Sequence, residues 1–157
     1  TVRLWKIVEE SQLVFRLSET DGGSLDEVVA VAHSTQFVTA SDTGRLSVWS
    51  TGRKKPVFTV QAHATGISCL VCPEATDIVI SGGFDGAVKI WRIRTDEDDD
   101  DGDEIELVNE LPVPGHVTSA VMVDESTLAV AVGPEGRLGR WTVDPTIKPS
   151  ILIFKTQ

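Results

Sequence analysis

The sequence of 157 residues has no long apolar run, only two cysteines and none of the common nucleotide-binding motifs. No segment approaches membrane-spanning length and no secretory signal pattern opens the chain, so we expect an intracellular domain without a membrane partner. Cys69 and Cys72 form a C-x-x-C spacing, but the further ligands of a zinc site are missing. Residues three apart on a strand point to opposite faces, so we expect two reduced thiols and no metal site.

Enzyme motifs are missing as well. The sequence contains no Walker loop, no dinucleotide fingerprint and no paired catalytic carboxylates. We therefore expect a protein without a cofactor and without catalytic activity.

The most informative segment ends at Trp91, with Ser81 ten residues before the tryptophan, Asp85 six before it and His63 further upstream. Asp85-Gly86 is a strong signal for a tight hairpin turn between two strands. A histidine, an aspartate, a serine and an indole N–H can form one hydrogen-bonded chain inside a small sheet. This pattern is the signature of a WD40 repeat, in which these four residues form a structural tetrad.

The presence of a serine, a histidine and an aspartate does not by itself indicate a hydrolase. A nucleophilic serine needs an exposed position beside an oxyanion hole, whereas Ser81 is expected within a strand. We therefore interpret the tetrad as stabilising its sheet.

The pattern recurs along the chain. Tryptophans fall at positions 5, 49, 91 and 141, so the intervals are 44, 42 and 50 residues. Turn glycines and alternating apolar residues precede the last three. A period of about 40–45 residues with four short strands per unit predicts an all-β fold, the WD40 β-propeller.

We expect about three and a half blades, the C-terminal part of a ring of about seven blades. A separate domain of 157 residues is the alternative. The expected blades are 1–17 (the second half of one blade), 18–61, 62–111 and 112–157. Trp49, Trp91 and Trp141 should lie on third strands, and in the last blade Arg137–Val143 should precede an outer strand at Ile151–Lys155.

The net charge of −10 is concentrated in one segment. Nine of the 24 acidic residues lie in 96–106, which leaves 15 acidic against 14 basic residues in the rest of the chain. We expect this run to be an extended insertion within the blade at 62–111, because like charges repel. It is either a solvated loop or a decoy for basic partners.

Basic residues provide the candidate binding surface. Arg53, Lys54 and Lys55 are consecutive in an expected loop, while Arg45, Arg137 and Arg140 are further candidates. Contacts with RNA phosphates need little more than lysine and arginine on one accessible surface. Scattered surface charge is the alternative, so the residues alone support a WD40 interaction scaffold.

Several segments carry a family resemblance that covers essentially the whole chain. They are Leu4-Trp5-Lys6-Ile7, Glu9-Glu10-Ser11-Gln12-Leu13-Val14-Phe15, Lys54-Lys55-Pro56 and Gly136-Arg137-Leu138-Gly139-Arg140-Trp141. In this order they resemble the U3 small nucleolar RNA-interacting WD-repeat proteins, the ribosomal RNA processing protein 9 family.

The resemblance implies a non-enzymatic component of the U3 ribonucleoprotein in the nucleolus. It implies recognition of the box B/C region of U3 RNA together with a kink-turn-binding protein. It also implies a place among the proteins of the small-subunit processome, which processes precursor ribosomal RNA toward 18S. The competing hypothesis is a protein-only WD40 adaptor, such as a substrate receptor of a ubiquitin ligase.

Overall fold

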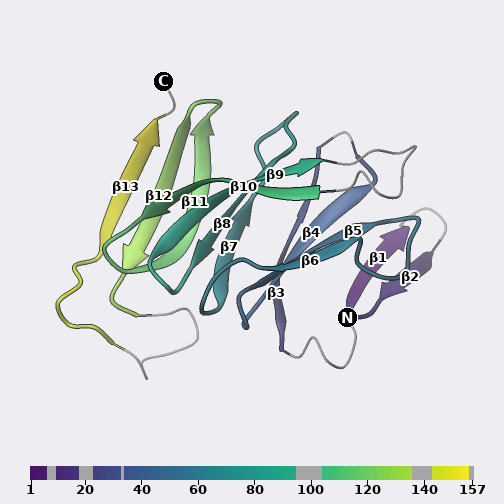
Figure 1. Cartoon of the computed structure of the whole chain (residues 1–157), viewed down its shortest axis with the longest axis horizontal. Helices are drawn as coiled ribbons and strands as arrows, with labels where there is room; N and C mark the ends of the chain where they lie inside the picture. Colours follow the sequence, from purple (N-terminus) through teal and green to yellow (C-terminus); the bar gives the residue numbers. More distant parts are fainter. Residues whose placement is uncertain (7–9, 18–22, 33, 95–103, 136–142, 156–157) are drawn as a thin grey trace.

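A computed structural model describes residues 1–6, 10–17, 23–32, 34–94, 104–135 and 143–155. All regular structure in these ranges is β-strand, and every pairing is antiparallel. Four sheets succeed one another from the N-terminal hairpin to the C-terminal strand β13 (Figure 1). In the described parts of the chain, no helix is long and apolar enough to cross a membrane.

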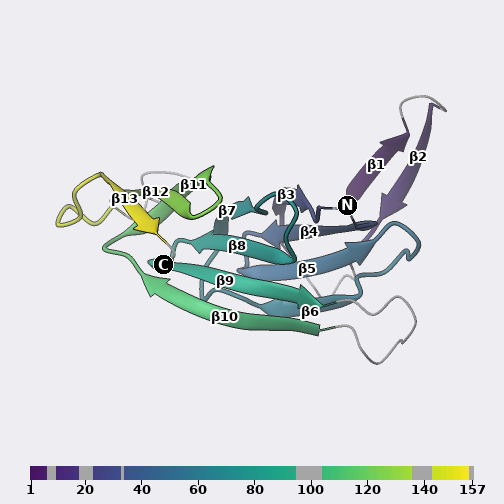
Figure 2. The same cartoon turned by 90° about the horizontal axis from the view of Figure 1, so that it is seen from above.

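The first sheet is a two-stranded hairpin of β1 (Val2–Lys6) and β2 (Ser11–Phe15). It projects from the N-terminal end of the stack of sheets (Figure 2). Its inner face meets the second sheet, where Phe15 packs edge-on against Phe37 with 5.1 Å between the ring centroids.

The second sheet consists of β3 (Leu25–Ala30), β4 (Gln36–Ser41), β5 (Arg45–Ser50) and β6 (Phe58–Gln61). Its strands pair in chain order. The central strands β4 and β5 are almost entirely buried, as expected for a sheet that is covered on both faces.

The third sheet repeats this arrangement with β7 (Ile67–Val71), β8 (Ile78–Gly83), β9 (Ala87–Arg94) and β10 (Glu104–Pro112). Strand β7 contacts β3 and β4 of the second sheet and β11 of the fourth. The innermost strands of neighbouring sheets therefore lie together, as in the radial arrangement of a propeller.

The spacing of the tryptophans correctly predicted which strand carries them in these two sheets. Trp49 lies on β5 and Trp91 on β9, which are the third strands of their sheets. In both sheets the turn into the third strand contains a glycine in the left-handed region, Gly44 with φ +80° and Gly86 with φ +78°. Trp141 lies outside the described residues.

The fourth sheet differs from the expectation. It contains β11 (His116–Asp124), β12 (Thr127–Gly133) and β13 (Ser150–Lys155), and β13 pairs directly with β12 from Val132↔Ser150 to Thr127↔Lys155. Placing the strand Arg137–Val143 between them was wrong. In the observed register Leu152 and Phe154 of β13 pack on the apolar residues shared with the third sheet.

The acidic run also ends earlier than expected. Strand β10 begins at Glu104, two residues before the strand expected from Glu106, so Glu104 pairs with β9 instead of forming part of the insertion. Arg94 Nη2 lies 3.2 Å from Glu106 Oε2 at this end of the sheet. The preceding acidic residues, up to 103, lie outside the described residues.

Buried side chains gather between neighbouring sheets. The second and third sheets share the largest group, and a second group joins the third and fourth sheets. Packing between sheets is close enough to require glycine on β8. A Cβ on Gly82 would lie 2.4 Å from Val117 Cγ1, and one on Gly83 would lie 2.3 Å from His63 Nδ1.

We predict that Gly83→Ala destabilises the protein by about 1–3 kcal/mol, because the new methyl group must displace a buried ring. Gly133→Ala is the matched control, since Gly133 also lies on a strand but its Cβ would approach no atom nearer than 3.7 Å. Urea unfolding of both variants tests this prediction. Equal losses of unfolding free energy would contradict it.

Candidate functional site

The four residues of the expected tetrad come together between β8, β9 and the segment before β7. His63 Nδ1 lies 2.8 Å from Asp85 Oδ1, and His63 Nε2 lies 2.8 Å from Ser81 Oγ. The indole N–H of Trp91 donates to Ser81 Oγ over 2.9 Å. The second carboxylate oxygen of Asp85 accepts the backbone N–H of Ala64. The four side chains form one connected chain of hydrogen bonds in the order Asp85, His63, Ser81, Trp91.

The hydrogen bonds and the burial of His63 fit an uncharged ring. The Asp85 carboxylate can only accept, so Nδ1–H donates to it. Nε2 of the uncharged ring accepts from the Ser81 hydroxyl, which in turn accepts from the Trp91 N–H. Burial lowers the pKa of His63, and the hydrogen bond with Asp85 offsets part of that effect.

Burial limits what the tetrad can do chemically. Ser81 is 0% exposed and His63 is 1% exposed, so neither side chain is open to a substrate. Both ring nitrogens of His63 already face partners. The geometry therefore supports a stabilising role for the tetrad in its sheet. The size of its contribution to stability is a prediction.

The second sheet contains a shorter version of the tetrad. The indole N–H of Trp49 donates to Thr39 Oγ1 over 2.9 Å, so a threonine takes the place of Ser81. Ser41 Oγ lies 2.8 Å from Thr43 Oγ1 in the following turn. Trp49 is fully buried and stacks on Phe37, with 5.9 Å between the ring centroids.

The candidate binding residues divide between two places. Arg53, Lys54 and Lys55 are exposed on the loop between β5 and β6. Arg45 begins β5, about 20 Å away along the strand, and its Nε donates to Gln61 Oε1. The structure therefore does not bring Arg45 to the other three cations. Arg137 and Arg140 lie outside the described residues.

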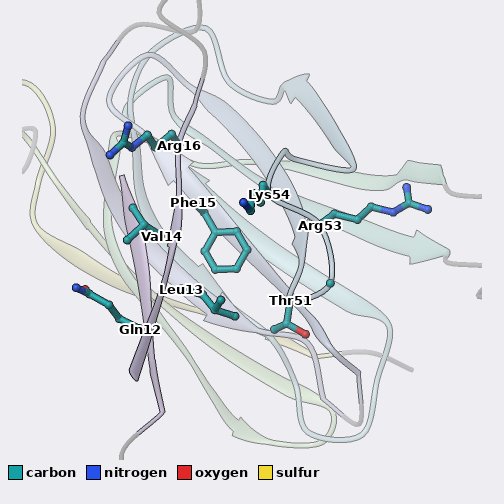
Figure 3. Close-up of a pocket in the computed structure, with 9 residues that line it drawn as sticks. Gln12, Leu13, Val14, Phe15, Arg16, Thr51, Arg53 and Lys54 are labelled. Atoms are coloured by element: carbon teal, nitrogen blue, oxygen red, sulfur yellow. The ribbon is translucent and has the colours of Figure 1, made fainter. Parts of the chain in front are cut away.

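A groove of about 570 Å³ separates this basic loop from strand β2. Leu13 and Phe15 leave β2 on the side of the loop, whereas Gln12, Val14 and Arg16 leave it on the other side (Figure 3). The lining residues are Gln12, Leu13, Val14, Phe15, Arg16, Thr51, Gly52, Arg53 and Lys54.

The cysteines do not form a site. Cys69 is buried on β7, Cys72 is half-buried just after it, and neither forms a disulfide. Within the described ranges, no three histidine, cysteine, aspartate or glutamate side chains are grouped as metal ligands would be.

Comparison with known proteins finds similarity to WD-repeat proteins, several of which are named for the U3 particle or for ribosome biogenesis. The family model "WD domain, G-beta repeat" matches residues 54–92. The "U3 snoRNP-associated protein-like EMB2271" of Arabidopsis thaliana is 30% identical over 159 residues, covering 90% of this chain and 31% of the relative. The "Ribosomal RNA-processing protein 9" of Saccharomyces cerevisiae is 25% identical, covering 90% of this chain and 36% of the relative.

A solved structure gives the same result in three dimensions. The chain matches "Structure of U3-55K" with a TM-score of 0.81 and 26% identity, over 98% of this chain and 48% of that chain. The chain folds as WD40 propeller blades and resembles the U3-associated WD-repeat family. It spans about a third of the curated relatives' length and about half of the solved chain.

Sequence reasoning missed the groove beside the basic loop. Leu13 and Phe15 are two residues apart on a short strand, so they share one apolar face. That spacing did not indicate which part of the chain would lie opposite this face. The register Leu4↔Leu13 and the loop between β5 and β6 together create the groove, and neither was predicted in that detail.

We predict that Asp85→Ala destabilises the protein by about 1–3 kcal/mol, because His63 and the Ala64 N–H lose their acceptor. Thr43→Ala should cost less, since Thr43 is exposed and its hydroxyl bonds to the Ser41 hydroxyl instead of to a buried histidine. Thermal melts of both variants test this prediction, and equal melting shifts would show that Asp85 has no special role.

We also predict a pH dependence that originates in His63. Its pKa is lower in the folded chain than the ordinary 6.5, so the unfolded chain binds a proton more readily. The unfolding free energy should therefore fall as the pH drops below about 6.5, until the folded-state pKa is passed.

The measurement is urea unfolding at several pH values between 7.5 and 5.5, for the unmodified protein and for His63→Gln. The variant should be less stable throughout and should lose the component that originates in His63. Parallel curves for the two proteins would contradict the assignment, because the pH dependence would then come from other groups.

Proposed function

We propose that this chain is part of a non-catalytic RNA- and protein-binding scaffold of the U3 small nucleolar ribonucleoprotein. In this role it acts in small-subunit processome assembly and in processing of precursor ribosomal RNA toward 18S. Its place of action is the nucleolus.

One observation carries the proposal. The similarity extends over 90% of this chain in the Arabidopsis thaliana relative and over 98% in the U3-55K structure. A shared WD40 signature alone would support the fold and leave the function open. The names of two relatives refer to the U3 particle and to ribosomal RNA processing, and these names support the more specific function.

The tetrad supports the non-catalytic part of the proposal. Ser81, His63 and Asp85 occur together, but the serine accepts from Trp91 and is enclosed within a sheet. A nucleophilic serine would need access to substrate and a neighbouring oxyanion hole. These residues contribute hydrogen bonds that hold the blade.

The basic loop is the proposed contact with the particle. Arg53, Lys54 and Lys55 are exposed and consecutive, so their side chains can reach phosphates or carboxylates without disturbing β5 or β6. We assign them to contacts with U3 RNA near the box B/C region or with an adjoining protein, such as the kink-turn-binding protein. Arg137 and Arg140 are weaker candidates for the same role.

We predict that reversing Arg53, Lys54 and Lys55 to glutamate in the intact protein weakens its association with the U3 particle. Each phosphate contact that is lost should reduce the slope of log affinity against log salt by about one unit. Pull-down of U3 RNA over a series of salt concentrations measures both effects. A combined Lys148→Glu and Lys155→Glu variant serves as control, because both residues are exposed near or on β13 at the far end of the stack.

Unchanged association and salt slope in a folded triple variant would remove the loop from the binding surface. An intact protein that recovers proteins but no U3 RNA would instead support a protein-only WD40 adaptor.

A further inference from the structure

Strand β2 presents a free edge beside the basic loop. Within the described part of the chain, β2 pairs only with β1. The groove touches five consecutive residues of this strand, 12–16. Leu13 and Phe15 point toward the loop, so the groove lies on that face of β2. A strand added at the free edge would direct alternate side chains to the same face.

The groove has an apolar wall on the side of the loop. Leu13 and Phe15 both point toward Thr51 and Lys54 (Figure 3). Leu13 is 40% exposed, whereas Phe15 is 2% exposed because it packs against Phe37 and Trp49. An aliphatic side chain in the groove could therefore pack against Leu13, while Phe15 is held in place behind it by its contacts with the second sheet.

The charge of the groove selects its occupant. Its nine lining residues include the cations Arg16, Arg53 and Lys54 and no acidic residue, and Lys55 follows directly on the loop. A segment that carries carboxylates would therefore be attracted to the groove and held in register there.

We propose that the β2 edge binds an extended acidic peptide segment of a partner protein. The segment adds as a strand to β2. On the side of the loop it places an aliphatic side chain against Leu13 and a carboxylate toward Lys54, and on the other side it directs a carboxylate to Arg16. Backbone hydrogen bonds along an exposed edge supply affinity, and the neighbouring pocket and cations supply specificity. The inference rests on the proposed function in using the same basic loop, and it names the chemical class of that loop's partner.

The groove favours a peptide over single-stranded RNA. Sequence-tolerant RNA binding combines cations with exposed aromatic rings on which bases stack. Phe15 is the one aromatic residue among those that line the groove, and its ring is buried in the contact with Phe37 and Trp49. A free strand edge, by contrast, matches the spacing of peptide N–H and C=O groups.

The probe is a blocked, fluorescent seven-residue peptide with one central leucine among acidic residues, so that it can present carboxylates on both faces of the added strand. We expect it to bind the intact protein in a fluorescence anisotropy titration. Leu13→Glu and Lys54→Glu should each weaken binding by about tenfold, through like-charge repulsion and loss of a cation respectively. The matched controls, Ile151→Glu and Lys148→Glu, should leave binding unchanged, since both residues are exposed outside the groove.

Backbone methylation of the peptide provides a test that requires no protein variant. In an added strand only alternate N–H groups face β2, so methylating one alternate set should abolish binding and methylating the other should not. Equal effects of the two sets, or no binding of the parent peptide, would overturn the proposal. Binding of an oligouridine probe that Leu13→Glu does not weaken, without peptide binding, would identify an RNA surface and also overturn it.

The two proposals fail separately. If the triple reversal leaves U3 association intact while the peptide still binds at the edge, the proposed function of the loop is wrong and the docking site stands. If U3 association falls but no peptide binds, the docking site is wrong and the loop contacts the particle in another way.

Discussion

The structure depends on satisfying the buried polar groups at the junction of two sheets. His63 lies on the segment that leaves β6 and enters β7. Its backbone N–H donates to Gly44 O in a turn of the second sheet, while its ring joins Asp85 and Ser81 of the third. An unpaired donor here would cost about 1–3 kcal/mol, so the junction constrains both sheets at once.

The next junction uses the same backbone contact with different side chains. Val113 N donates to Gly86 O, just as His63 N donates to Gly44 O, and both accepting glycines lie in left-handed turns. There the ring of His116 meets Phe84 O instead of a carboxylate and a serine. Repeats can therefore keep their relative placement through backbone bonds while the side-chain network varies.

Features with local sequence signals were predictable, and those that depend on pairing between distant segments were not. The Asp85-Gly86 turn and the phasing of Trp49 and Trp91 determine two sheets, because turn chemistry and spacing act within one blade. The pairing of β13 with β12 joins segments that are distant in the sequence, and Leu152 and Phe154 of β13 pack on apolar residues shared with the third sheet. The groove depends on two sheets meeting, so neither strand alone contains its signal.

The same packing explains where recognition can occur. The faces of the central sheets are occupied by neighbouring sheets, and their polar side chains are held in internal hydrogen bonds. Loops and outer strand edges are accessible, and their backbone N–H and C=O groups can still form hydrogen bonds with a partner. Since the chain outside 96–106 is nearly neutral, with 15 acidic and 14 basic residues, three consecutive cations beside a free edge form a distinct local field. Recognition by this chain is therefore expected at that edge more than on a sheet face.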